Sequence, residues 1–230
     1  MSTSDYTPYT VDVVFCIDVT ASMTPYLDEL KKLASNFDKV LEGELNAQRK
    51  GIEKLRVRIV WFRDLGESSE DAIGATPFYS LPSQQHLFAE QINSLVASGG
   101  GSYPESSLEA LWYAMNSDWQ HVGRRRRHII VLATDDSAHP LGKFPFELEQ
   151  VKFPTPKDMT ELEKRWGILG MDEHAVMDKN SRRLVLFAPD KSPWGLLEKW
   201  PSVMWLPSAA GSGLSDTEFR QICSIIAQSV

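Results

Sequence analysis

The sequence contains little cysteine and no long hydrophobic run. Two cysteines, Cys16 and Cys223, occur among 230 residues. Both lie in apolar or amphipathic segments, so we interpret them as small buried hydrophobic residues and expect neither a disulfide nor a zinc site. No apolar stretch approaches the roughly 18 residues that a bilayer-spanning helix requires. The sequence therefore predicts no membrane span and no membrane partner.

An excess of basic residues is lacking too. The formal net charge is -7, which argues against nucleic acid as a partner through bulk electrostatics. The opening segment MSTSDYTPYT has neither the basic nor the apolar part of a signal peptide. We therefore expect a cytoplasmic protein in a bacterium-like setting. The P-loop motif Gly-x-x-x-x-Gly-Lys-[Ser/Thr] is absent, which argues against that kind of nucleotide binding.

Composition and patterning indicate an α/β fold. The hydrophobic content of 42 % and the charged content of 24 % are ordinary for a globular protein. The length suits one large domain, and no repeat or linker divides the chain, so we expect a single domain over residues 1–230. Strand and helix patterns alternate, which predicts a doubly wound, mostly parallel six-stranded sheet with helices on both faces. The predicted strands lie at 11–17, 55–62, 78–81, 128–133, 184–188 and 203–206.

Two of these strands and one helix have distinctive signals. The run HIIVLA at 128–133 is typical of a sheet centre covered on both faces. The short segment 78–81 is expected to be an antiparallel edge strand. After the first strand, Thr24-Pro25 predicts a helix start, and apolar residues at spacings of three or four from Leu27 to Leu41 predict one continuous helix.

The segment Asp18-Val19-Thr20-Ala21-Ser22 follows the first predicted strand directly. One carboxylate with hydroxyls two and four residues later suits a hard divalent cation, and oxygen ligands favour Mg²⁺, Mn²⁺ or Ca²⁺ over softer metals. The same residue types are also common as caps in strand-to-helix loops, so plain loop chemistry is an alternative.

Two further oxygen-rich segments follow predicted strands or precede helices. They are the loop 99–105 and the pair Asp135-Asp136 after the strand at 128–133. Ligands of doubly wound sheets bind beyond the carboxyl ends of the strands, where all three segments are expected to meet. Three such segments in this order are a stronger signal for a metal site than any one alone.

The order and spacing of these segments resemble a von Willebrand factor type A domain along nearly the whole chain. The resemblance is to the bacterial cytoplasmic branch that occurs beside tellurite-resistance-type genes and kinase–phosphatase partners. It implies a metal-ion-dependent adhesion site in which Asp18 and Asp135 are the anionic members and Thr20 and Ser22 are hydroxyl ligands. The segments that carry it are 15–23, Phe62-Arg63-Asp64, 99–105, 135–140 and Leu186-Phe187-Ala188-Pro189-Asp190.

The second loop departs from the family pattern. Most members carry Thr there, and the triple-glycine branch usually carries Asp, whereas this chain has Ser102. A serine hydroxyl can still ligate the metal, but it adds no charge. Mg²⁺ with two carboxylate ligands has a net charge of zero, whereas Mg²⁺ with three would have a net charge of about -1. The cation would then be held less tightly and stay more electrophilic. Glu105 either compensates for the lost charge or simply favours the start of a helix through the helix dipole.

Other polar residues near these segments have ordinary explanations. We expect Asp136 to serve a turn or cap, Asp64 to be a local loop partner and His139 to be structural. The run 124–127 consists of four arginines in an acidic protein. It is either a solvated lead-in to the following strand or a docking patch for an acidic or phosphorylated partner.

These features predict a metal-dependent protein-binding module and not an enzyme. The partner would present Asp or Glu to the metal, and a kinase or phosphatase of the same system is a candidate. A metal-free scaffold is one alternative. A phosphatase of the haloacid-dehalogenase type is another, but it needs a second Asp at position 20, which is Thr. We expect Asp18 at the surface, so that its removal spares the fold.

Overall fold

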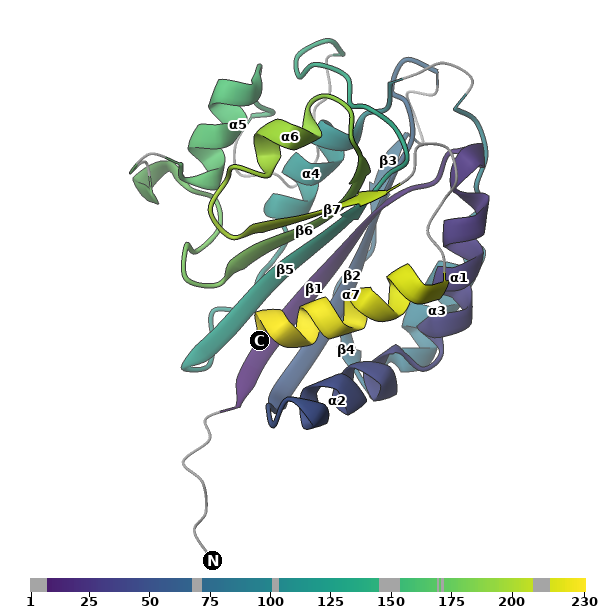
Figure 1. Ribbon diagram of the computed structural model, residues 1–230, viewed down its shortest axis with the longest axis vertical. Coiled ribbons are helices and arrows are strands. Elements are labelled where there is room, and N and C mark those ends of the chain that lie inside the picture. Colours follow the sequence, from purple (N-terminus) through teal and green to yellow (C-terminus); the bar gives the residue numbers. More distant parts are fainter. Residues whose placement is uncertain are drawn as a thin grey trace, which may run out of the picture.

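The strand β1 (Tyr9–Asp18) is the central element of the molecule because parallel strands pair with it on both sides. Nine of its ten residues are buried, as a continuous apolar run in a covered sheet requires. The computed structural model describes residues 8–67, 72–100, 104–144, 154–168, 170, 172–208 and 216–230. Figure 1 shows β1 running upward through the sheet to the edge where its carboxyl end lies.

The sheet has seven strands and is mostly parallel, in the order β3-β2-β1-β5-β6-β7 with β4 also paired to β2. The prediction of six strands is therefore wrong, because β3 pairs with the end of β2 as an additional antiparallel strand. The segment expected as an antiparallel edge strand is confirmed as β4. The remaining strands are β2 (Ile52–Phe62), β3 (Ile73–Ala75), β4 (Tyr79–Leu81), β5 (Arg125–Ala133), β6 (Arg182–Pro189) and β7 (Val203–Ser208).

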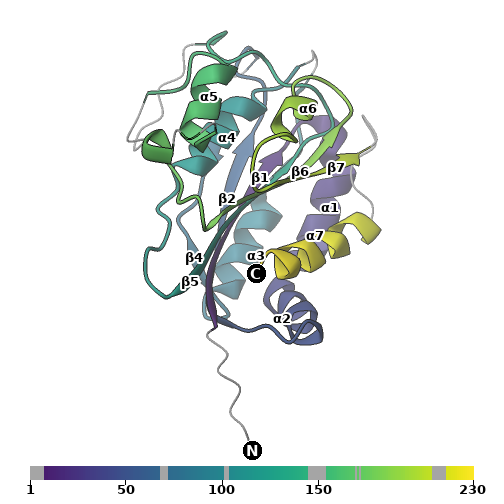
Figure 2. The same ribbon diagram turned by 60° about the vertical axis from the view of Figure 1, so that its left-hand side comes forward.

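Alternate residues of β1 belong to two separate hydrophobic clusters, as the two-residue period of a strand dictates. Val13 and Phe15 join a cluster with the helices α1, α2, α3 and α7, whereas Val14 and Cys16 join one with α4, α5 and α6. Figure 2 shows α4 and α5 on one side of the sheet and α1, α2 and α7 on the other. This arrangement is compatible with a doubly wound α/β fold. The helices are α1 (Thr24–Ala34), α2 (Phe37–Ala47), α3 (Gln85–Ser94), α4 (Ser107–Met115), α5 (Met159–Trp166), α6 (Trp194–Leu197) and α7 (Asp216–Ser229).

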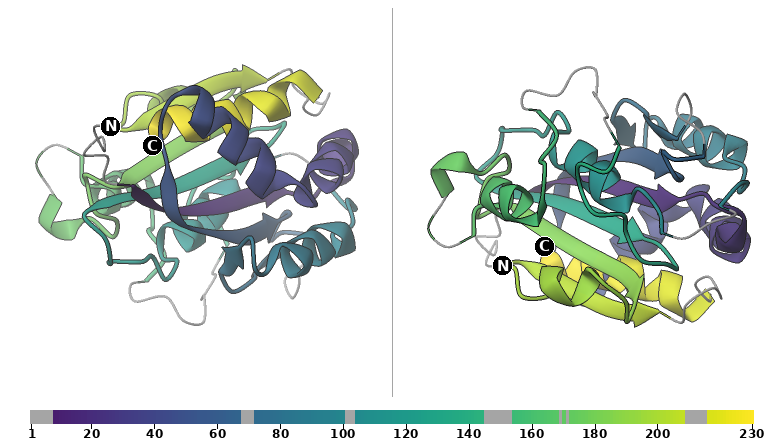
Figure 3. Two further views of the ribbon diagram at one scale, coloured as in Figure 1. Left: turned by 90° about the horizontal axis from the view of Figure 1, so that it is seen from below. Right: turned by 90° about the horizontal axis from the view of Figure 1, so that it is seen from above.

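The helix expected to run on to Leu41 is divided into α1 and α2, with Ser35 and Asn36 between them. Both residues compete for backbone hydrogen bonds and favour helix ends, which explains the break. The apolar positions Phe37 and Leu41 are nevertheless buried, as their spacing predicted. After the break, α2 packs against α7, and Figure 3 shows the two helices side by side from below.

The parallel strands bring the segments after β1 and β5 to one edge of the sheet. Ile17 lies beside Ala133 in the β1–β5 pairing, so the residues that follow each strand are neighbours. No helix within the described ranges is long and apolar enough to cross a membrane.

Candidate metal centre

Asp18 lies at the last position of β1 and is completely buried, so the expectation that it is a surface residue is wrong. Its Oδ1 accepts hydrogen bonds from the Thr20 backbone N–H at 2.9 Å and the Thr20 hydroxyl at 2.6 Å. Its Oδ2 accepts from the Thr134 hydroxyl at 2.8 Å. All these donors are neutral. Burial raises the pKa of Asp18 to about 6, although the hydrogen bonds from Thr20 and Thr134 oppose the shift.

The next two predicted ligands connect Asp18 to Asp135. The hydroxyls of Thr20 and Ser22 are 3.4 Å apart, and the Ser22 hydroxyl donates to Asp135 Oδ1 at 3.1 Å. Asp135 Oδ2 is buried and has no hydrogen-bond partner within the described residues. Burial raises the pKa of Asp135, while the Ser22 hydrogen bond opposes this shift. The structure thus brings four of the five predicted ligands into one hydrogen-bonded row.

Ser102, the fifth predicted ligand, lies outside the described residues. The start of its loop nevertheless packs directly on the Asp18 segment. The Ala21 backbone N–H donates to the Gly99 carbonyl at 3.1 Å. Gly100 has a φ of +83°, and a Cβ there would lie 2.7 Å from the Thr20 Cβ. Only glycine allows this backbone conformation and this close approach without strain.

Glu105 lies behind this loop and is only 2 % exposed. Its Oε2 has no hydrogen-bond partner in the described part of the chain. Burial, followed by repulsion from Asp18 and Asp64, raises its pKa to about 8. Four residues later, in the first turn of α4, Glu109 is fully buried, and burial raises its pKa to about 7. Glu105 beside the row and Glu109 behind it in the chain therefore bear negative charge only at a cost in free energy.

The other acidic residues near the row are engaged elsewhere. Asp136 Oδ1 accepts hydrogen bonds from the Ser137 backbone N–H at 2.6 Å and from Lys191 Nζ at 2.9 Å, in agreement with a turn role. Asp64 Oδ1 accepts from the Gly66 backbone N–H at 2.8 Å and lies 3.1 Å from His139 Nε2. Both of these residues have the structural roles that we expected.

Sequence reasoning missed Thr134, which donates to Asp18, and Glu109, a buried carboxyl within reach of the Asp64 charge. Thr134 immediately precedes Asp135 at the end of a strand, and that position next to a suspected ligand is a usable signal for a supporting hydroxyl. Glu109 has no comparable signal, because its spacing is that of an ordinary helical residue.

The oxygen donors of the row fit a hard divalent cation. Two carboxylates and two hydroxyls match the ligand types that Mg²⁺, Mn²⁺ and Ca²⁺ prefer. The unpartnered Asp135 Oδ2 and the uncompensated Asp18 both favour a positive charge nearby. No group of three or more His, Cys, Asp or Glu residues suited to a metal ion occurs in the described ranges. Any cation here must therefore rely on hydroxyls and water as well as on carboxylates.

Comparison with known proteins shows the fold alone. No protein family and no curated protein matches the chain. Among solved structures, it resembles the pilus adhesin SpaC from Lactobacillus rhamnosus GG, with 11 % identity and a TM-score of 0.53 over 96 % of this chain. It also resembles proximal thread matrix protein 1 from the mussel byssus, with 10 % identity and a TM-score of 0.52 over 97 % of this chain. The chain spans 31 % of the SpaC chain and 49 % of the mussel protein.

Proposed function

We propose that the protein is a metal-dependent protein-binding module of the von Willebrand factor type A kind, with Asp18, Thr20, Ser22, Ser102 and Asp135 around the metal. The observation that supports this most is the row in which Ser22 joins Asp135, 113 residues away in sequence, to the Asp18 loop. Loop capping alone explains the Asp18–Thr20 contacts, but it does not explain a second carboxylate at the same point.

One member of the row reaches the surface, as a binding site needs. Asp18 and Thr20 are buried, whereas Ser22 is exposed. When bound, Mg²⁺, Mn²⁺ or Ca²⁺ supplies a positive charge and a coordination position for an Asp or Glu carboxylate of the partner. Asp18 and Asp135, which are both buried, supply negative charge beneath the cation, and the exposed Ser22 lies on the side from which the partner arrives. A kinase or phosphatase of the same cellular system is the partner class we favour, in a cytoplasmic setting.

Capture of the partner is expected to depend on the metal. Immobilised protein should retain a protein partner from a lysate in Mg²⁺ and release it with a chelator, and Asp18→Ala should retain none. Asp136→Asn is the matched control, because that neighbouring carboxylate is engaged by Lys191 and should not matter. Partners that survive both chelation and Asp18→Ala would refute the proposal. They would favour a metal-free scaffold instead.

Metal affinity is expected to decrease in two stages as the pH is lowered. A proton competes with the cation for Asp18, whose pKa is about 6. Protonation of Glu105, whose pKa is about 8, removes a nearby attractive charge at higher pH. Below each pKa the protonated form prevails, so affinity decreases as pH falls, approaching about tenfold per unit below pH 6. Mn²⁺ titrations between pH 9 and 5 measure this profile.

The variant Glu105→Gln separates the two stages. It should lose the change near pH 8, keep the change near pH 6, and be at least as stable as the wild type without metal. A pH profile identical to that of the wild type would show that the charge of Glu105 does not affect metal affinity. A flat profile for the wild type between pH 7.5 and 5 would contradict the role of Asp18.

A further inference from the structure

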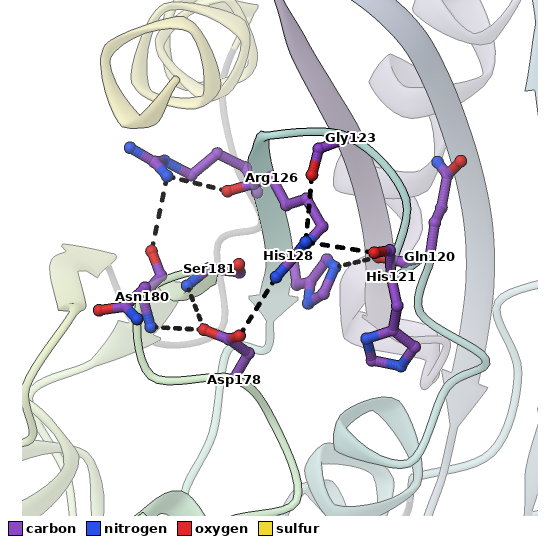
Figure 4. Close-up of polar contacts among 9 residues, drawn as sticks. Gln120, His121, Gly123, Arg126, His128, Asp178, Asn180 and Ser181 are labelled. Carbon is purple, nitrogen blue, oxygen red and sulfur yellow. Dashed lines mark hydrogen bonds and ion pairs between the residues drawn. The ribbon is translucent and has the colours of Figure 1, made fainter.

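The four consecutive arginines at 124–127 do not act as one patch, because the fold uses the third of them. Arg126 donates to the backbone carbonyls of His121 at 3.2 Å and Gly123 at 3.1 Å. Its Nη2 lies 3.5 Å from an Asp178 carboxylate oxygen. Figure 4 shows the Arg126 side chain directed at these partners. Arg126 is therefore a structural residue with a neutralised charge.

Arg127 is held by the fold as well, but its charge is not neutralised. Its Nε donates to the Ser229 carbonyl of α7 at 2.5 Å, and its Nη1 reaches the Asn180 carbonyl at 3.5 Å. Its Nη2 is 3.4 Å from the Tyr9 hydroxyl. These acceptors are neutral, and no carboxylate is paired with Arg127 in the part of the chain that the structure describes. Its position is fixed while its positive charge remains.

Arg125 and Arg183 have fewer hydrogen-bond partners among the described residues than Arg126 and Arg127. Arg125 is exposed, and its guanidinium lies over the Tyr9 ring at 5.4 Å from the ring centre. Arg183 is half-buried and donates through Nη1 to the Arg182 carbonyl at 2.6 Å. Within the described residues, neither guanidinium forms an ion pair. Most of their N–H groups thus remain available to a ligand.

The sheet places Arg125, Arg127 and Arg183 on one face, at the amino-terminal ends of β5 and β6. Arg125 and Arg127 are two residues apart on one strand, so they share a face. Both lie over the ring of Tyr9, at 5.4 and 4.8 Å from its centre. Arg183 is paired with Ile129, which lies on the same face as Arg127 two residues further along β5. This end of the sheet is opposite to the end that carries Asp18.

The arginines at this face repel one another. Burial, and then the charges of Arg127 and Arg182, lower the pKa of Arg183. Like charges close to one another cost free energy that a bound anion would recover. Beside Arg183 lies a cleft of about 330 Å³, which the end of α7 also lines through Gln228 and Ser229. A ligand that reaches Arg183 therefore has room next to it.

We propose that Arg125, Arg127 and Arg183 form a binding site for a phosphate group. A phosphate monoester carries a charge of about -1.5 to -2 and three acceptor oxygens, which matches several guanidinium forks better than one carboxylate does. The Tyr9 ring contacts two of the guanidiniums and so helps to position both. The site differs from the proposed metal site in position, in charge and in ligand, so either can exist without the other.

Titration of inorganic phosphate into the ¹⁵N-labelled full chain at constant ionic strength tests the site. The Nε–H signals of Arg125 and Arg183 should shift together and saturate, without change on adding a chelator. Arg183→Gln and Arg125→Gln should each weaken binding at least fivefold. Lys164→Gln on α5 and the exposed Arg124→Gln are controls with the same loss of charge, and each should change the affinity less than twofold.

Three results would overturn the proposal. They are shifts that do not saturate, equal weakening of phosphate binding by the two control variants, and unchanged phosphate binding in Arg183→Gln.

A phosphoserine peptide is compared with its serine and glutamate versions to identify the source of the phosphate. Tighter binding of the phosphopeptide than of inorganic phosphate points to a phosphorylated protein, and equal binding points to a small phosphate ester. A glutamate peptide that binds as tightly as the phosphopeptide contradicts the phosphate class.

Discussion

Asp18→Asn is expected to lower the affinity for Mg²⁺ and Mn²⁺ by about 100-fold or more, because replacing even a residue that supports a metal ligand typically costs 10- to 100-fold. The same change should not destabilise the metal-free protein. Burial raises the pKa of Asp18 to about 6, so above that pH the folded state carries a charge that it disfavours. The amide oxygen can keep the two hydrogen bonds from Thr20, and the Thr134 hydroxyl can rotate to accept from the new NH2 group. Calorimetric metal titration and thermal unfolding at pH 7.5 measure both effects.

The combination of these two effects is what distinguishes a metal ligand from a structural residue. A structural loop carboxylate would lower the melting temperature when replaced and leave metal binding unchanged. Asp136→Asn is the control, since Asp136 is paired with Lys191 and should show no large change in metal affinity. An Asp18→Asn variant that binds Mn²⁺ as the wild type does would contradict the account.

Asp12→Ala is expected to have the opposite outcome, with a large loss of stability and no effect on metal affinity. Asp12 is fully buried on the same strand as Asp18, but Arg56 binds it through two hydrogen bonds at 2.9 and 2.7 Å. Gln120 adds two more, from its backbone N–H at 2.8 Å and its side-chain amide at 2.6 Å. Removing the carboxylate leaves a guanidinium without its partner.

The free energy of unfolding of Asp12→Ala should fall by about 3 kcal/mol, at the low end of the range for a broken buried ion pair because Arg56 is 22 % exposed. Urea unfolding measures the change, and the exposed Asp28→Ala is the control with the same chemical change. Adding Arg56→Met to Asp12→Ala should restore part of the loss by removing the unpaired charge. A change below 1 kcal/mol for Asp12→Ala would contradict this role of the ion pair.

The sequence predicted the parallel strands because their apolar runs are long, and it missed β3 because three residues carry no periodicity. The strand Ile73–Ala75 includes a glycine, and only its pairing with the end of β2 makes it a strand. The break between α1 and α2 was missed for a related reason. The apolar spacing continues through Ser35 and Asn36, and the buried face gives no sign that the backbone changes direction there.

At the candidate site, residue types were predictable and burial was not. The oxygen-rich segments after β1 and β5 identified the row, because the carboxyl ends of parallel strands meet at one edge. That Asp18 is buried depends on contacts from distant parts of the chain, namely Thr134 beside it and Gly100 over Thr20. The burial of Glu105 likewise follows from the packing of its loop against residues 137–139.

Diffraction from crystals grown with Mn²⁺, measured at an energy where manganese scatters anomalously, tests the metal site most directly. We expect one strong peak beside the hydroxyls of Thr20 and Ser22, within roughly 2.0–2.6 Å of at least one of them, with Asp135 bound directly or through water. The peak should be absent in Asp18→Asn. A peak that avoids this row, or no peak at a Mn²⁺ concentration that saturates the protein in solution, would contradict the proposed metal site.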